Sequence, residues 1–164
     1  MQQTSELSPH GSMRRKEREI SSRTEIDAII QSSTIMHVAL AENNIPFVVP
    51  VFYAYDGVSL FFHSAQSGSK IEIMKRNPNV CFEISVAEGV IESDTACDFE
   101  AKHRTVIGFG TTSFIEAEAE KIDVLNLIVA RFSPKKFLYP SANLNNTAVI
   151  RIAIASIKGK MHGY

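Results

Sequence analysis

The chain has 164 residues, of which 45% are hydrophobic and 21% are charged, and its formal net charge is -1 at pH 7. This near-neutral balance argues against the basic surface of a nucleic-acid-binding protein. No apolar run approaches the ~20 residues that span a bilayer, and the amino end lacks the apolar core of a signal peptide. We therefore expect a cytoplasmic protein with one domain and no membrane segment.

Cysteine usage argues against both a disulfide framework and a zinc site. The two cysteines, Cys81 and Cys97, are widely spaced and show no CxxC pattern. His103 and Asp98 could join Cys97 around an ion, but no second ligand pair has the spacing of a zinc knuckle. No metal site is predicted.

The amino-terminal residues predict a tail before the folded domain. Residues 1–12 are polar and aperiodic, which is typical of a flexible segment, so the domain is expected at residues 13–164. The basic run at residues 14–18 is interpreted as a solvated arm, or alternatively as a contact to a dimer partner or a phosphate. Next, Ser22 stands three residues before Glu25, the spacing of a capping box, and predicts a short amphipathic helix.

From Ile35 onward, β-branched and aromatic residues predict at least six strands, at residues 35–41, 46–55, 58–65, 79–87, 104–117 and 148–157. Short connections between the first three runs, one of them with Asp56-Gly57, predict an antiparallel meander. Helical patterns occur at residues 67–78 and 118–133, and the acidic stretch 88–103 is expected to be a long loop. The order of elements favours a mainly β, antiparallel barrel with a few peripheral helices.

The stretch LFFHSAQSGSK, residues 60–70, places a strand end directly before a helix start. A lysine in the first turn of a helix opposes the helix dipole, so Lys70 makes sense beside a phosphate bound to free backbone N–H groups. The alternative is that Ser67 or Ser69 caps the helix and Lys70 lies on the surface. His63 is either a satisfied structural residue or a titratable group beside the phosphate.

A second cation, Arg104, leads into a strand that contains Gly108 and Gly110. Their missing side chains allow close approach of a ligand, or alternatively mark a bulged barrel strand. Nucleotide-binding loops are not supported, because GxxxxGK[ST] is absent and Ser113 replaces the last glycine of GxGxxG. A hydrolase is not supported either, because there is no GxSxG elbow.

Four blocks, taken in order, resemble the nitroimidazole-resistance (Nim) proteins of the pyridoxamine 5'-phosphate oxidase-like flavin-binding split-barrel family. They are MRRKEREI, the run from VVPVFYAYDG through FHSAQSGSK to NPNVCFEI, ACDFEAKHRTVIGFG, and AVIRIAIASIKGK. The resemblance covers about Met13 to Lys160, and its most specific parts are FHSAQSGSK, NPNVCFE and RTVIGFG.

The resemblance implies a split β-barrel homodimer that binds FMN, or else the larger FAD, in clefts at the subunit interface. It implies contacts of the isoalloxazine with Pro50, Val51, Phe52 and Tyr53, and of the phosphate with Ser64, Ser69, Lys70, Arg104 and Thr105. His63 matches the family histidine that faces the flavin and the substrate, where an imidazole hydrogen-bonds the acceptor or delivers a proton.

The implied function is an FMN-dependent oxidoreductase that reduces a small nitroaromatic such as a 5-nitroimidazole, with His63 as the catalytic residue. The cofactor would supply the redox chemistry, so few catalytic side chains are needed. The chain has no Trp and lacks the carboxy-terminal, arginine-bearing segment of pyridoxamine 5'-phosphate oxidase, which argues against vitamin B6 oxidation. The alternative is a flavin- or haem-binding module without a dedicated substrate; a purely structural barrel is a third interpretation.

Overall fold

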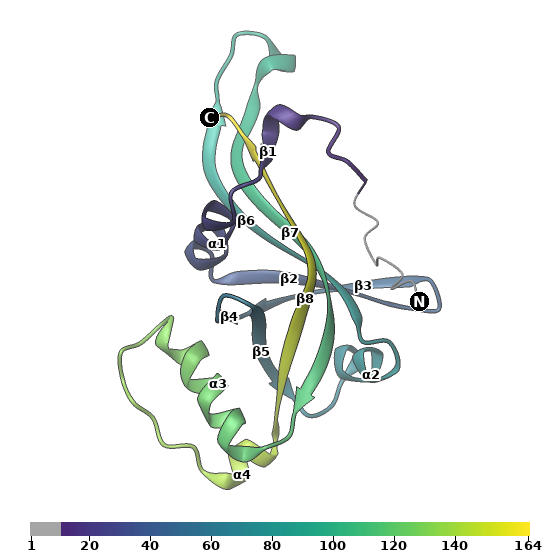
Figure 1. Ribbon diagram of the computed structural model, residues 1–164, viewed down its shortest axis with the longest axis vertical. Helices are drawn as coiled ribbons and strands as arrows, with labels where there is room; N and C mark the ends of the chain where they lie inside the picture. Colours follow the sequence, from purple (N-terminus) through teal and green to yellow (C-terminus); the bar gives the residue numbers. More distant parts are fainter. Residues whose placement is uncertain (1–10) are drawn as a thin grey trace, which may run out of the picture.

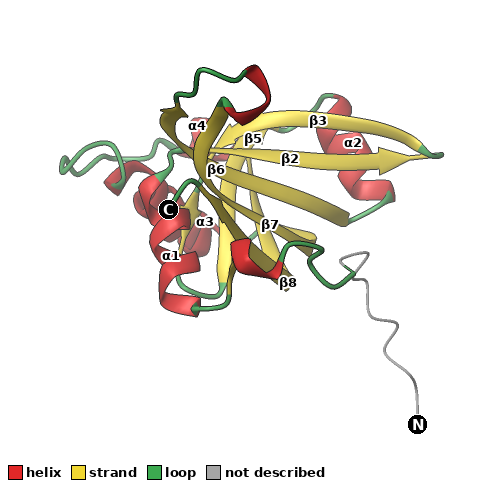
Figure 2. Cartoon of the chain, turned by 90° about the horizontal axis from the view of Figure 1, so that it is seen from above, coloured by secondary structure: helices red, strands yellow, loops and turns green. Residues whose placement is uncertain are grey.

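The computed structural model describes residues 11–164, so most of the predicted tail lies outside the described residues. One antiparallel sheet coils around a central core, with the helices at its periphery (Figures 1 and 2). This confirms the mainly β fold predicted from the sequence. Among the described residues, no helix is long and apolar enough to cross a membrane.

The strands are β1 (Glu19–Ile20), β2 (Ile35–Glu42), β3 (Ile45–Phe52), β4 (Ala54–Tyr55), β5 (Ser59–Ala65), β6 (Asn79–Ile91), β7 (Glu100–Ile115) and β8 (Thr147–His162). The α-helices are α1 (Arg23–Ser32), α2 (Ser69–Arg76), α3 (Glu118–Ala130) and α4 (Ser141–Asn145), and short 3-10 turns occupy Lys16–Arg18 and Ala96–Asp98. The strand order is β3-β2-β6-β7-β8-β5-β4, and β1 pairs with β8.

The predicted strand at residues 46–55 divides at Tyr53 into β3 and β4, which stand at opposite ends of the strand order. Both hairpins of the predicted meander are present, since β2 pairs with β3 and β4 pairs with β5. Tyr53 is fully buried, and its hydroxyl donates a hydrogen bond of 3.0 Å to the Ser33 carbonyl. The break at this anchored residue carries the chain from one end of the sheet to the other.

The acidic stretch 88–103 does not form the long loop that its composition predicts. β6 continues to Ile91 and β7 begins at Glu100, so Val90 pairs with Ala101 beyond a bulge after Ala87. Both faces of this protruding hairpin are largely in water, and its side chains therefore carry no apolar alternation to mark it as a strand. Backbone pairing between β6 and β7 stabilises this hairpin, and that pairing cannot be recognised from the composition.

Two apolar clusters lie on opposite faces of the sheet. The larger one fills the barrel interior and includes Phe62 and Phe82, while the smaller one packs under α3 and includes Phe61. A Cβ atom at Gly108 would overlap the ring of Phe82. A Cβ atom at Gly110 would collide with the Ala153 carbonyl, and the β7–β8 ladder shifts register beside it, with the extra residue on β8. Both glycines thus allow close packing within the barrel, and an irregularity in the ladder does lie beside Gly110.

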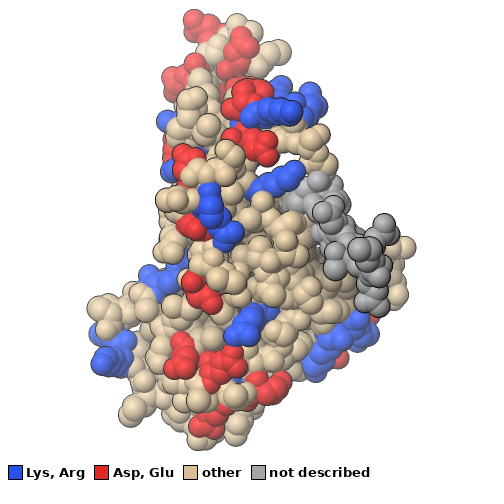
Figure 3. All heavy atoms as spheres, viewed as in Figure 1, with Lys and Arg blue, Asp and Glu red and all other residues tan. Residues whose placement is uncertain are grey.

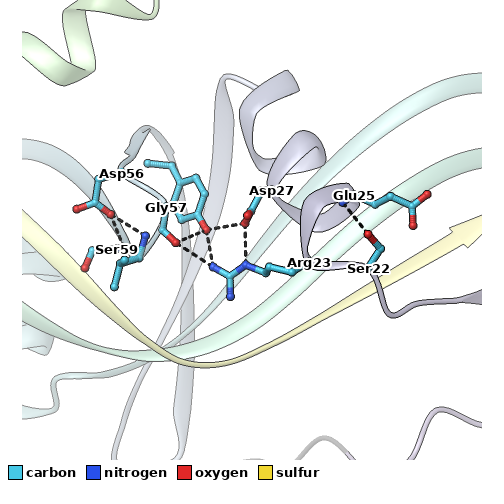
Figure 4. Close-up of polar contacts among 9 residues, drawn as sticks. Ser22, Arg23, Glu25, Asp27, Asp56, Gly57 and Ser59 are labelled. Atoms are coloured by element: carbon cyan, nitrogen blue, oxygen red, sulfur yellow. Dashed lines mark hydrogen bonds and ion pairs between the residues drawn. The ribbon is translucent and has the colours of Figure 1, made fainter.

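Helix α1 is fixed to the β4–β5 turn by a polar network (Figure 4). Arg23 donates to Asp27 at 2.8 Å and to the Tyr55 hydroxyl at 2.6 Å, and the Tyr55 hydroxyl donates to Asp27 at 2.7 Å. Ser22 accepts from the Glu25 amide at 3.4 Å, which confirms the predicted cap. The helix therefore starts where the sequence predicts and packs over one end of the barrel.

Candidate flavin site

The turn from β5 into α2 leaves the start of α2 open. Gly68 is the N-cap residue, with φ of 120°, and no side chain caps the helix. The alternative in which Ser67 or Ser69 caps α2 is therefore wrong. Because Gly68 accepts from the Ile71 and Glu72 amides, the amides of Ser69 and Lys70 are the ones left free for a bound anion.

Lys70 stands at this helix start without a carboxylate partner among the described residues. Glu72, the acid in the first turn of α2, instead forms ion pairs with Lys75 at 3.2 Å and Arg76 at 3.8 Å. A cation at the positive end of a helix dipole is unfavourable unless an anion balances it. The local electrostatics therefore suit a phosphate group.

His63 lies near the end of β5, directly opposite Val149 of β8. Its imidazole makes no hydrogen bond within residues 11–164, and much of the residue faces solvent. Partial burial of the imidazole lowers its pKa below the ordinary 6.5, and the charge of Lys70 lowers this pKa further. At neutral pH the ring is therefore neutral, with one N–H donor and one acceptor nitrogen.

The segment Pro50–Tyr53 divides between two environments. Pro50 and Phe52 point outward beside a groove of about 200 Å³ that Ile35 and Val51 also line. Val51 is buried, and so is Tyr53, whose ring stacks under the Arg131 guanidinium at 4.5 Å. Pro50 and Phe52 can offer their side chains to a planar ring, whereas Tyr53 can offer only its backbone.

Arg104 and Thr105 lie in the upper part of β7 and point to opposite faces of the sheet. Arg104 forms an ion pair with Glu88 and lies 5.5 Å from the Tyr164 ring, and its Nε atom is buried without a hydrogen-bond partner. The Thr105 hydroxyl is 3.0 Å from the Ser85 hydroxyl. Thus the Arg104 guanidinium is already largely engaged within the chain.

Thr105 also lines a groove of about 300 Å³ with two lysines that the sequence reasoning missed, Lys158 and Lys160 of β8. His103 completes its polar lining, and the Lys158 ammonium donates to the Gly11 carbonyl at 2.8 Å. The alternating KGK pattern at residues 158–160 was the signal for two cations on one strand face. Elsewhere on the visible surface, basic and acidic side chains are interspersed (Figure 3).

One chain does not bring the two groups of predicted phosphate ligands together. Ser64 pairs with Ala148 near the start of β8, and Arg104 pairs with Met161 near its end. These β8 positions are about 40 Å apart along the strand. Figure 1 shows α2 beside the lower end of β7 and the β6–β7 hairpin at the upper end.

The coiled antiparallel sheet with peripheral helices is the fold of the flavin-binding split barrels. The sequence profile described as pyridoxamine 5'-phosphate oxidase matches residues 22–161. The chain belongs to this family.

Solved structures with the same fold include a candidate 5-nitroimidazole antibiotic resistance protein from Bacteroides thetaiotaomicron. It is 27% identical, the match covers 87% of this chain and 86% of that one, and the TM-score is 0.79. A flavocytochrome from Azotobacter vinelandii is 22% identical, with coverage of 93% and 72% and a TM-score of 0.84. An FAD- and haem-binding protein from Mycobacterium smegmatis is 19% identical, with coverage of 90% and 74% and a TM-score of 0.83.

A curated relative, an uncharacterized protein of Rhizobium meliloti, is 30% identical over 66 residues. The match spans 40% of this chain and less than half of the relative, namely 43%. It supports a shared segment and says nothing about the activity of either protein.

Proposed function

We propose that this protein is a homodimeric, flavin-dependent oxidoreductase that passes electrons to a small aromatic acceptor such as a 5-nitroimidazole. The observation that carries the proposal is the uncapped start of α2, where Lys70 has no counter-ion among the described residues and His63 stands close by. Membership of the family and the likeness to a candidate nitroimidazole resistance protein, at 27% identity, support the same function.

The chain's own residues suit FMN in two places. Free amides at the start of α2, with Lys70 and the Ser69 hydroxyl, can hold the terminal phosphate. The outward side chains of Pro50 and Phe52 offer an apolar edge for the isoalloxazine. When bound, the flavin supplies the electrons, and the protein holds, orients and shields it. FMN has both the phosphate and the isoalloxazine ring that these residues would bind. FAD would add an adenylate, for which these residues offer no further contact.

His63 is the protein group proposed to act on the acceptor. Reduction of a nitro group to a nitroso group takes two electrons and two protons and releases water. An imidazole with a lowered pKa becomes a stronger acid once protonated, so it can hand a proton to a nitro oxygen. Because the His63 imidazole has no hydrogen-bond partner within residues 11–164, both ring nitrogens remain free to meet an acceptor.

A homodimer would account for the separation of the predicted phosphate ligands. Arg104 and Thr105 lie too far along the sheet to touch a phosphate held at Lys70 of the same chain, so the partner subunit would have to supply them. The outer face of β2 and β3 is also apolar around Val48, which is 61% exposed. A second copy of the chain would bury this face in a dimer interface.

The second candidate function is a cofactor-binding module without a dedicated substrate. The same observation on His63 favours it, because no described group orients the imidazole as a catalytic acid or base would require. Two structural neighbours are a flavocytochrome and an FAD- and haem-binding protein. A haem would be recognised in the absorption spectrum of the purified protein.

The test is an absorption spectrum of the purified protein, followed by anaerobic reduction of a 5-nitroimidazole with a chemical reductant as electron source. We expect a flavin spectrum and turnover that depends on the protein. A colourless protein that also takes up no added FMN would contradict the proposal. A flavin- or haem-loaded protein with no turnover would favour the module.

A further inference from the structure

The connection between α3 and α4, residues 131–140, is tied at its root to the end of β3. Arg131 donates hydrogen bonds to the carbonyls of Tyr53 at 3.1 Å, Gln31 at 2.9 Å and Ser33. Its guanidinium also stacks on the Tyr53 ring at 4.5 Å. Because three carbonyls and a ring hold one side chain, the first residues of the connection are fixed in place.

Phe132, the next residue, is thereby placed against Phe52. The ring centroids are 5.2 Å apart and the planes meet at 76°, the edge-to-face arrangement that aromatic rings prefer. Yet Phe132 is 51% exposed, about as much as Phe52. A pair that leaves half of each ring in water contributes little to the core, and its free apolar surface suits a ligand.

The groove beside this pair is apolar throughout. It is lined by Ile35, Pro50, Val51 and Phe52 and has a volume of about 200 Å³. Ile35 stands directly opposite Phe52 in the β2–β3 ladder, so the groove has two rigid strand walls. An apolar cavity of about 150 Å³ is enough for one benzene ring. With no charged residue in the lining, the groove suits a small, uncharged, planar ring.

We infer that Phe132 and Phe52 form the wall that selects planar aromatic acceptors, with Phe132 as a specificity-determining residue contributed by a different element. The inference rests on the proposed function: the flavin ring would lie along the Pro50 side of this edge of β3, and the acceptor would enter between that ring and the Phe52–Phe132 pair. Arg131 is a positioning residue, since it fixes Phe132 and touches neither acceptor nor cofactor. A flat aromatic acceptor gains ring contacts here, whereas a small hydrophilic acceptor gains none.

The test compares Phe132→Ala with Phe137→Ala, a matched control that is 48% exposed in the same connection. Calorimetric titration measures the binding of a 5-nitroimidazole to each purified protein, and steady-state assays give KM for the nitroimidazole and for ferricyanide. For Phe132→Ala we expect about three- to tenfold weaker nitroimidazole binding and a similar rise in its KM. The KM of Phe132→Ala for ferricyanide should stay at the wild-type level. The nitroimidazole affinity of Phe137→Ala and its KM for each acceptor should also be unchanged.

Three results would overturn the inference: unchanged nitroimidazole binding in Phe132→Ala, equal effects on both acceptors, or no binding of nitroimidazole to the wild type. Flavin content, read from the absorption spectrum of each variant, separates this test from that of the proposed function. If the wild type binds no flavin, the proposed function fails, but the calorimetric comparison still decides whether Phe132 lines an aromatic pocket.

Discussion

His63 and Lys70 influence each other electrostatically although they come from different elements. Lys70 disfavours protonation of the imidazole, and partial burial acts in the same direction and more strongly. The fraction of His63 that carries a proton therefore becomes appreciable only below its ordinary pKa of 6.5. The proposed proton transfer has a definite pH signature for this reason.

We expect kcat/KM for nitroimidazole reduction to rise as the pH is lowered from roughly 8 to 6, because the imidazolium fraction grows in this range. His63→Gln should remove this rise and lower the rate about 100-fold at the acidic end. Both proteins are assayed anaerobically with saturating flavin, and their flavin dissociation constants are measured alongside. Equal rates and parallel pH profiles would take His63 out of the mechanism.

Strict alternation along β3 distinguishes residues that the family resemblance groups together. Pro50 and Phe52 share the exposed face of β3, because side chains alternate along a strand. Val51 and Tyr53 therefore belong to the buried face. This assignment can be made from the sequence alone. The long-range bonds of Tyr53 to the α1–β2 connection could not be predicted from the sequence. Nor could the contact between Phe52 and Phe132, because it joins a strand to a connection 80 residues further along the chain.

At the scale of elements, the sequence predicts the type of an element and its first residue well where a local motif such as an N-cap marks it. Ser22 caps α1 as its spacing predicts, whereas Ser67 and Ser69 do not cap α2 because Gly68 takes the N-cap position. A glycine with φ of 120° adopts a conformation that other residues rarely reach, and it frees the first amides of α2. The phosphate interpretation thus depends on a backbone detail that composition does not reveal.

Pairing between distant strands is the part of the fold that local patterns leave open. β3 and β4 stand at opposite ends of the strand order, because β3 pairs with β2 and β4 pairs with β5, although only Tyr53 separates the two strands in the chain. The outer part of the β6–β7 hairpin, within residues 88–103, was also hidden, because its composition is acidic and its exposed strands carry no apolar alternation. The class of fold was predictable from hairpin spacing, and the order of strands was not.

At the scale of the whole molecule, the proposed dimer is tested by placing a charge on the apolar outer face. Val48→Lys should raise the dimer dissociation constant about 100-fold or more, because a buried, unpaired ammonium opposes association. Flavin affinity should fall with it, since the site would draw on both chains. Sedimentation velocity over a concentration series measures the first effect, and fluorescence titration the second.

The matched control is Val58→Lys, the same substitution at a residue that is 72% exposed in the β4–β5 turn. It should leave both the dimer and the flavin affinity unchanged. If Val48→Lys behaves like this control and remains dimeric, the outer face of β2 and β3 is not the interface.

The phosphate at the start of α2 is the contact on which the proposed function depends most directly. The decisive measurement is the FMN dissociation constant of Lys70→Ala beside that of Lys75→Ala, a lysine of the same helix that pairs with Glu72. We predict about 10- to 100-fold weaker FMN binding for Lys70→Ala and no change for Lys75→Ala. Riboflavin, which lacks the phosphate, should bind Lys70→Ala and wild type equally. FMN affinity that is the same in all three proteins would contradict the phosphate site.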